Sequence, residues 1–216
     1  MALFRDRHDA GKRLAEQLSE YAGEPDLLVL ALPRGGVPVA YEVAKALDAQ
    51  LDIFLVRKLG VPGHEELAMG AIATGGVRVL NESVVSALQI PRKVIDAVAH
   101  EEQEELERRE RAYRGDRPRP QIEGRTVILV DDGLATGASM RAAVAGLREQ
   151  NPARIVVGVP TAAPETCEMF EDEVDDIVCA ATPQPFFGVG FWYANFSQTT
   201  DDEVRRLLKA SAAAKE

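Results

Sequence analysis

Several short, almost entirely apolar runs constrain the fold of this chain more than any other feature of its sequence. Each is four to seven residues long, which is typical of strands buried on both faces of a parallel sheet. Stretches of helical periodicity lie between them, at 37–47, from about 139, and at 164–170. The predicted strands are residues 26–32, 51–56, 126–130, 155–159 and 176–179. This alternation predicts an open, mostly parallel α/β sheet.

The remaining segments predict elements around that sheet. The sequence predicts helices over residues 4–22 and over the highly charged stretch 91–114. The second helix is either a solvated helix with ion pairs between successive turns or a hood or dimer arm. A C-terminal helix over 201–213 has Thr200 as its N-cap and Glu203 in the capping-box position. Two short β-prone runs, 71–74 and 77–80, are joined by Gly-Gly and predict a hairpin.

Charge and composition exclude several classes of protein. The formal net charge is −10, so the chain is a poor candidate for a dedicated nucleic-acid binder. No apolar run approaches about 18 residues, which predicts no membrane partner. The spacing of Cys167 and Cys179 fits neither a disulfide framework nor a zinc site, and predicts buried thiols in a reducing compartment. Because the N-terminus also lacks the apolar core of a signal peptide, we expect a cytoplasmic protein.

One segment combines the features of a binding site. The apolar strand 127–130 ends in Asp131 and Asp132, and a loop of small residues then leads into a helix near Ser139. Ligands of open α/β sheets bind at the carboxyl ends of strands, and a helix N-terminus with free N–H groups favours an anion. The loop therefore predicts a phosphate site, and the two carboxylates predict hydrogen bonds to a polyol attached to that phosphate. A ribose 5-phosphate satisfies both requirements.

Other phosphate and hydrolase motifs are absent from the sequence. It contains no GxxxxGK[ST] P-loop, and no GxGxxG follows a predicted strand. Ser139 lies in GASMR rather than in the GxSxG elbow of hydrolases.

At residues 127–139 the chain resembles the phosphoribosylpyrophosphate (PRPP) signature of the type I phosphoribosyltransferases. The segments LPRGGVPVA (32–40) and VRKLGVPGHEELAMGAI (56–72) extend the resemblance, which is closest to an uncharacterised bacterial branch. The resemblance implies a three-layer α/β fold and a single domain over 1–216. It also implies a small hood near 1–25 and 183–200, a helical insertion near 83–115 and a mobile loop at 58–70.

The resemblance also implies a role for each candidate residue. Asp131, Asp132, Arg34 and Lys58 are the expected catalytic residues, and the two aspartates would hold the ribose hydroxyls directly or through Mg²⁺. The 5-phosphate would be bound by Ala135, Thr136, Gly137, Ala138 and Ser139. Pyrophosphate would be bound by Arg34, Gly35, Gly36, Arg57 and Lys58, with a cis peptide expected at Pro33–Arg34 or its neighbour. Phe186 and Phe187 are expected to form the acceptor pocket. His64, in the expected mobile loop, is a candidate acid or base that ranks third, after Arg34 and Lys58.

The expected reaction is Mg²⁺-assisted displacement of pyrophosphate from PRPP by a small nitrogenous acceptor, most simply a nucleobase. Two alternatives stay open at this point: a sensor of the same fold that binds PRPP or a nucleotide without chemistry, and a phosphoribosyl hydrolase that uses water. The sequence leaves the acceptor unidentified, and it leaves open whether the chain forms a homodimer.

Overall fold

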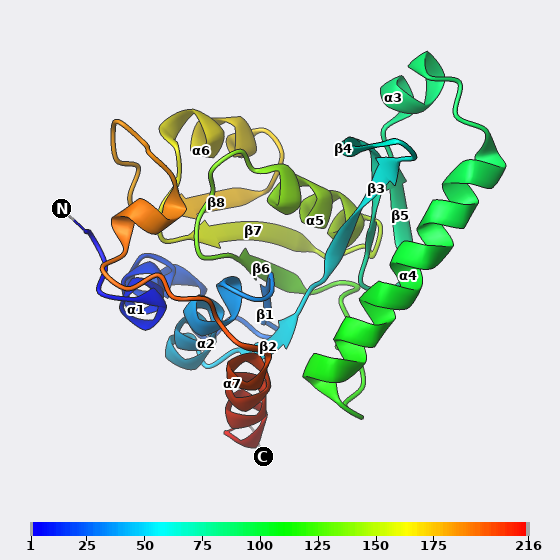
Figure 1. The fold of residues 1–216 in the computed structure, drawn as a ribbon. Coiled ribbons are helices and arrows are strands. Elements are labelled where there is room, and N and C mark those ends of the chain that lie inside the picture. The colour runs from blue at the N-terminus through cyan, green and yellow to red at the C-terminus, as the bar shows by residue number, and fades with distance from the viewer. Residues whose placement is uncertain (1, 215–216) are drawn as a thin grey trace.

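A five-stranded parallel sheet forms the centre of the protein in the computed structural model, which describes residues 2–214 (Figure 1). The strand order is β2-β1-β6-β7-β8, and every neighbouring pair is parallel. All five strands were predicted, with boundaries shifted by at most about three residues. Their bounds are β1 Leu28–Ala31, β2 Gln50–Ile53, β6 Thr126–Val130, β7 Arg154–Val159 and β8 Asp176–Cys179.

Helices cover both faces of this sheet, so the fold has three layers. Alternate strand residues point to opposite faces: Val29 and Ala31 belong to the core beneath α1, α2 and α7, whereas Leu28 and Leu30 belong to the core beneath α5 and α6. The helices on the first face are α1 Arg7–Gln17, α2 Gly36–Ala46 and α7 Asp201–Ala213. Those on the second are α5 Ala138–Arg148 and α6 Pro164–Glu171, and the 3₁₀ turns are η1 Ser19–Tyr21 and η2 Val189–Trp192.

A second, antiparallel sheet projects from the central one and corrects the expectation of a loop at 58–70 (Figure 1). Its strands are β3 Val56–Val61, β4 His64–Ala73 and β5 Val77–Leu80, so only Pro62 and Gly63 form the connection between β3 and β4. Alternation explains the difference, since Leu59, Val61 and Met69 turn inward to the core while polar neighbours stay outside. The predicted Gly-Gly hairpin joins β4 to β5.

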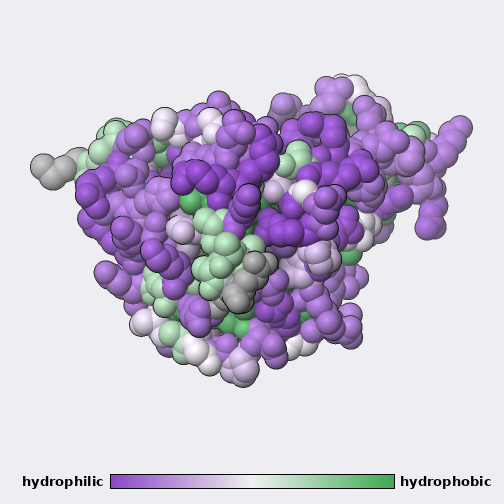
Figure 2. Space-filling view, turned by 90° about the horizontal axis from the view of Figure 1, so that it is seen from below, coloured by the Kyte–Doolittle hydropathy of each residue, from purple (hydrophilic) through white to green (hydrophobic). Residues whose placement is uncertain are grey.

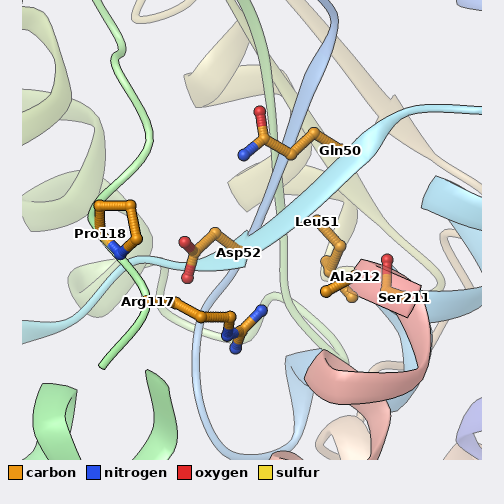
Figure 3. A pocket seen from close by; sticks show the side chains of 7 residues that line it. All are labelled: Gln50, Leu51, Asp52, Arg117, Pro118, Ser211 and Ala212. Atoms are coloured by element: carbon orange, nitrogen blue, oxygen red, sulfur yellow. The ribbon is translucent and has the colours of Figure 1, made fainter. Parts of the chain in front are cut away.

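The long charged helix lies along this projecting sheet. It is α4, Arg92–Arg114, preceded by a short helix, α3, Glu82–Ala87. Both helices lie within the helical insertion that was expected near 83–115. The last turn of α4 is fixed to the edge strand β2 by a buried ion pair, in which Nε of Arg114 lies 3.2 Å from both carboxylate oxygens of Asp52. Asp52 also lines, with Arg117, a pocket of about 430 Å³ between β2 and the end of α7 (Figure 3).

The two cysteines form a disulfide, which corrects the prediction of free thiols. Cys167 on α6 is bonded to Cys179 at the end of β8. They are separated by 12 positions in the sequence, and packing of α6 against β8 brings them together. The argument for a reducing compartment therefore fails, and a cytoplasmic location stays a prediction without support from the cysteines.

The surface seen from the C-terminal end of α7 is mainly hydrophilic, with a small apolar patch at its centre (Figure 2). Within residues 2–214, no helix has both the length and the apolar character needed to cross a lipid bilayer.

Candidate active site

The loops that follow β1 and β6 meet at the carboxyl ends of these neighbouring strands. Ala31 pairs with Val130, so the segment 33–36 leaves the sheet beside Asp131. A Cβ atom on Gly36 would lie 2.7 Å from the carbonyl oxygen of Val130, and one on Gly35 would lie 2.0 Å from a carboxylate oxygen of Asp132. Glycine is therefore required for this close approach. The Pro33–Arg34 peptide bond is cis, as the family resemblance implied.

Asp131 and Asp132 form a carboxylate pair that the protein environment makes difficult to ionise. Burial raises the pKa of Asp131 well above its usual range, and the neighbouring charge of Asp132 raises it further. Burial also raises the pKa of Asp132, although the cation beside it opposes that shift. The backbone N–H of Asp132 donates to Oδ1 of Asp131 at 2.8 Å, which orients the first carboxylate.

The cation beside Asp132 is Arg7, which sequence reasoning did not identify. Its Nε and Nη2 both lie 2.8 Å from Oδ2 of Asp132. Nη1 donates to the carbonyl oxygen of Ser197 at 2.7 Å, and the guanidinium lies 3.9 Å from the ring centroid of Phe196. Arg7 therefore joins α1, the end of β6 and the segment before α7. The pattern around Arg7 gives no local signal, since it is one of several arginines near the start of an amphipathic helix.

The small-residue loop has the geometry expected of an anion-binding turn. Gly137 adopts a φ of 74° immediately before α5, and no side chain caps that helix. Thr166 donates to the carbonyl oxygen of Ala135 at 2.6 Å, and α6 packs so closely that a Cβ on Gly137 would lie 2.7 Å from the Phe170 ring. The other candidate phosphate-binding residues lie exposed around it: Ala135, Thr136, Ala138 and Ser139. The first turn of α5 can thus offer its N–H groups to an anion.

The predicted basic residues lie on a different side of the site from the aspartates. Arg34 donates to Asp201 of α7 at 3.5 Å, so Arg7 rather than Arg34 pairs with the acidic residues. Arg57 on β3 pairs with Glu102 of α4, and Lys58 is exposed on the same strand. His64 is exposed at the tip of the β3–β4 hairpin. The structure brings the backbone of 33–36 to the aspartates, while these basic side chains face α4, α7 or solvent.

The aromatic segment after β8 contacts the acidic residues through its last part. The hydroxyl of Tyr193 donates to the carbonyl oxygen of Asp132 at 2.6 Å. Val189 is so close to Gly133 that a Cβ there would lie 2.4 Å from a methyl group of the valine. Phe186 is half-buried against Trp192, whereas Phe187 is 66% exposed and contacts Phe191. The two predicted acceptor residues therefore form part of an open aromatic surface, not an enclosed pocket.

Sequence comparison identifies the family of this site. The family model described as "Phosphoribosyl transferase domain" matches residues 5–70 and 63–194. The chain belongs to the phosphoribosyl transferase family. The match includes the glycine loop, the acidic pair and the small-residue loop, and the parallel sheet agrees with the fold that the resemblance implied.

Individual relatives also support the assignment to this family. Two Mycobacterium tuberculosis proteins, from strains CDC 1551 and H37Rv, bear the name "Putative phosphoribosyl transferase" and are 48% identical over 96% of this chain. This chain spans 47% of their length. The crystal structure of TT1426 from Thermus thermophilus superposes with a TM-score of 0.85 at 42% identity, over 96% of this chain and 98% of the other.

The donor set of the site suits a magnesium ion shared with a substrate. Mg²⁺ in phosphate-transfer sites takes one or two carboxylates and fills its other positions with substrate phosphates and water. Asp131 and Asp132 are two such carboxylates, and only one of them is paired with an arginine. Across residues 2–214, no group of three or more His, Cys, Asp or Glu side chains could hold a metal ion, so a cage made by protein alone is not formed.

Proposed function

We propose that this protein is a PRPP-dependent phosphoribosyltransferase that joins a nitrogen nucleophile, most simply a nucleobase, to C1 of the ribose. The observation that carries the proposal is the contact between the two loops. Gly35 and Gly36 lie against Asp132 and Asp131, so groups suited to pyrophosphate and groups suited to ribose hydroxyls meet at one point. The uncapped start of α5 would supply a third subsite, for the 5-phosphate, on the loop that follows the acidic pair.

Each part of the site has a distinct task in this reaction. The α5 N-terminus and the hydroxyls of Thr136 and Ser139 would hold the 5-phosphate, while Asp131 and Asp132 would accept hydrogen bonds from the ribose hydroxyls. The backbone of Gly35 and Gly36 would hold pyrophosphate, with Arg34, Arg57 and Lys58 as candidate cations around it. The chain would act by positioning and by preorganised charge, since no nucleophilic side chain is required.

In the bond-making step, the acceptor nitrogen forms a bond to C1 and loses its proton to water, while the bond from C1 to the pyrophosphate oxygen breaks. The electron pair of the broken bond leaves with pyrophosphate, and the ribose carries positive charge in the transition state. Mg²⁺, when bound with the substrate, would neutralise part of the charge on the leaving group. Asp131 and Asp132 would hold the ring beneath that positive charge through the ribose hydroxyls.

The acceptor end of the site is proposed at the aromatic segment. Phe186 and Phe187 offer faces on which a nucleobase could stack. They follow β8 and belong to the same segment as Tyr193, which hydrogen-bonds to Asp132.

The test is release of pyrophosphate from Mg-PRPP with a panel of purine and pyrimidine bases. We expect release that depends on one class of base and yields the corresponding nucleotide. The Asp131→Asn/Asp132→Asn variant should lose most affinity for ribose 5-phosphate in calorimetry, with Asp116→Asn, an exposed carboxylate, as the control.

Two results would replace this proposal, and a third would revise its assignment of residues. Release without any base, with ribose 5-phosphate as product, would make the protein a hydrolase. Tight PRPP binding without release would make it a sensor. Unchanged ribose 5-phosphate affinity in the double variant would remove the assignment of the acidic pair.

A further inference from the structure

A small basic pocket lies between the glycine loop and the long helix α4. It has a volume of about 180 Å³ and is lined by residues from three elements: Arg34, Arg108, Arg109, Ala112, Tyr113 and Asp201. Arg34 follows β1, Asp201 begins α7, and the other four lie on the last turns of α4. Pockets that hold drug-sized molecules measure roughly 300–1,000 Å³, so this one suits a small ligand.

The charge of the pocket indicates that the ligand is an anion. Three of its six lining residues are arginines and one is an aspartate, in a chain whose formal net charge is −10. The side chains that line the pocket therefore carry a net positive charge, although the net charge of the whole protein is negative. Guanidinium groups bind phosphate oxygens through paired N–H donors, which makes a phosphate-bearing anion the matching ligand.

The arginines are held by carboxylates that such an anion would replace. Glu105 receives hydrogen bonds from Nε of Arg108 at 2.6 Å and from Nε of Arg109 at 2.7 Å. These bonds, that from Arg108 first, lower the pKa of Glu105 to about 2, so its carboxylate is ionised at neutral pH. Arg34 makes its weaker contact with Asp201 at 3.5 Å.

The helix that carries two of the arginines is anchored at the pocket. Tyr113 donates to Asp201 at 2.9 Å, and the next residue, Arg114, forms the buried ion pair with Asp52. Arg109 lies one helical turn before Tyr113, so both face the same side of α4. The backbone of α4 is thus fixed beside the glycine loop, while the side chains of Arg108 and Arg109 keep 65% and 45% of their surface exposed and are free to change partner.

We propose that Arg34, Arg108 and Arg109 form a binding site for a diphosphate group, in which α4 supplies two of the three cations. This inference rests on the proposed function only for the bearer of the diphosphate, which would be PRPP. The site would place the charged end of the substrate against α4, and the helical insertion would then be part of the site and not a separate appendage.

The experiment is calorimetric titration of the whole protein with inorganic pyrophosphate at fixed ionic strength, with and without Mg²⁺. We expect binding to the native protein. The Arg108→Gln/Arg109→Gln variant should bind roughly 10-fold more weakly, which is the scale of losing charge-assisted hydrogen bonds at a partly exposed site. The Glu105→Gln variant should bind a few-fold more tightly, because it releases both arginines.

Arg111→Gln is the matched control. It removes the same charge from an exposed position of the same helix, outside the pocket, and should leave pyrophosphate affinity unchanged. If the native protein does not bind pyrophosphate, or if Arg111→Gln weakens binding as much as the double variant, the site is refuted.

A second pair of titrations identifies the bearer. Loss of affinity for PRPP with retained affinity for ribose 5-phosphate, in the Arg108→Gln/Arg109→Gln variant, would support the pyrophosphate end of the substrate as the ligand. Retained affinity for both would support a separate diphosphate-bearing ligand at the same site. Pyrophosphate binding does not require turnover. The proposed diphosphate site is therefore tested independently of transferase activity in the base panel.

Discussion

The guanidinium of Arg7 lies 2.8 Å from the carboxylate of Asp132, although 125 positions separate the two residues in the sequence. This pair connects the N-terminal helix to the acidic end of β6. It places a cation where two carboxylates would otherwise be buried together. The same guanidinium holds the carbonyl oxygen of Ser197, so the segment that leads into α7 is tied to the site through one side chain.

Removing this cation should destabilise the fold. We expect Arg7→Gln to lower the free energy of unfolding by about 2 kcal/mol, below the 3–5 kcal/mol of a fully buried pair because both side chains keep some exposure. Urea unfolding at pH 7 measures the change. Arg5→Gln, which removes an exposed ion pair with Asp9, should cost less than about 0.5 kcal/mol. Equal losses of unfolding free energy in the two variants would show that the contact between Arg7 and Asp132 stabilises the fold no more than an exposed ion pair does.

The acidic pair should make stability fall as pH rises. Because the pKa of Asp131 is raised in the folded state, the folded protein holds a proton that the unfolded chain releases above the ordinary value of 3.8. The free energy of unfolding therefore decreases as pH rises from that value to the raised pKa. Asp131→Asn abolishes this loss and keeps an oxygen to accept the N–H of Asp132.

We accordingly expect Asp131→Asn to melt at a higher temperature than the native protein at pH 8, with the difference disappearing near pH 4. Thermal unfolding at both pH values measures this, and Asp116→Asn serves as an exposed control. An advantage that is larger at pH 4 than at pH 8 would contradict the assigned shift.

Local signals were sufficient to predict the central sheet. Each strand of the sheet is a short apolar run with a helical stretch or turn beside it, and α7 begins where Thr200 accepts from the N–H of Glu203. The projecting sheet was harder to predict, because His64 to Leu67 of β4 are exposed and their polar composition is typical of a loop. Pairing with β3, a non-local interaction, makes this segment a strand.

The sequence predicts the parts of the site that backbone loops form, but not the side chains that other elements bring to it. The order strand, acidic pair and small-residue loop is local, and parallel pairing of β1 with β6 brings the glycine loop to it. Arg7 could not be found, since its role depends on how α1 packs. The Cys167–Cys179 bond was missed for the same reason, because it depends on α6 lying beside β8.

The anchor of α4 is expected to contribute strongly to stability. Arg114 and Asp52 are both almost fully buried, so removal of the arginine leaves an uncompensated carboxylate. We expect Arg114→Ala to lower the free energy of unfolding by about 3–5 kcal/mol. Arg111→Ala, on the exposed side of the helix, should change it by less than about 0.5 kcal/mol. A cost below about 1 kcal/mol for Arg114→Ala in chemical unfolding would refute the anchor.

The disulfide is expected to stabilise the phosphate-binding loop through α6. Closing a loop of 12 positions contributes about 3 kcal/mol in the chain-entropy model. Reductant should lower the guanidinium unfolding midpoint of the native protein and leave that of Cys167→Ser/Cys179→Ser unchanged. Thr166, which holds the carbonyl of Ala135, is adjacent to Cys167, so ribose 5-phosphate affinity should also fall on reduction. The absence of any midpoint shift would show that the bond does not form in solution.

Arg34 allows the division of the site into a ribose half and a pyrophosphate half to be tested. Its backbone belongs to the loop that touches Asp131 and Asp132, but its guanidinium faces Asp201 and α4. We therefore expect Arg34→Ala to lower turnover by about 100-fold, the scale of losing one preorganised donor to a charge that develops in the transition state. Ribose 5-phosphate has no pyrophosphate and should bind almost as before, whereas PRPP should bind more weakly. Steady-state pyrophosphate release and calorimetry with the two ligands measure these effects, with Arg111→Ala as the control. If Arg34→Ala instead loses affinity for both ligands equally, Arg34 supports the fold of the loop or the 5-phosphate subsite, and pyrophosphate is bound elsewhere.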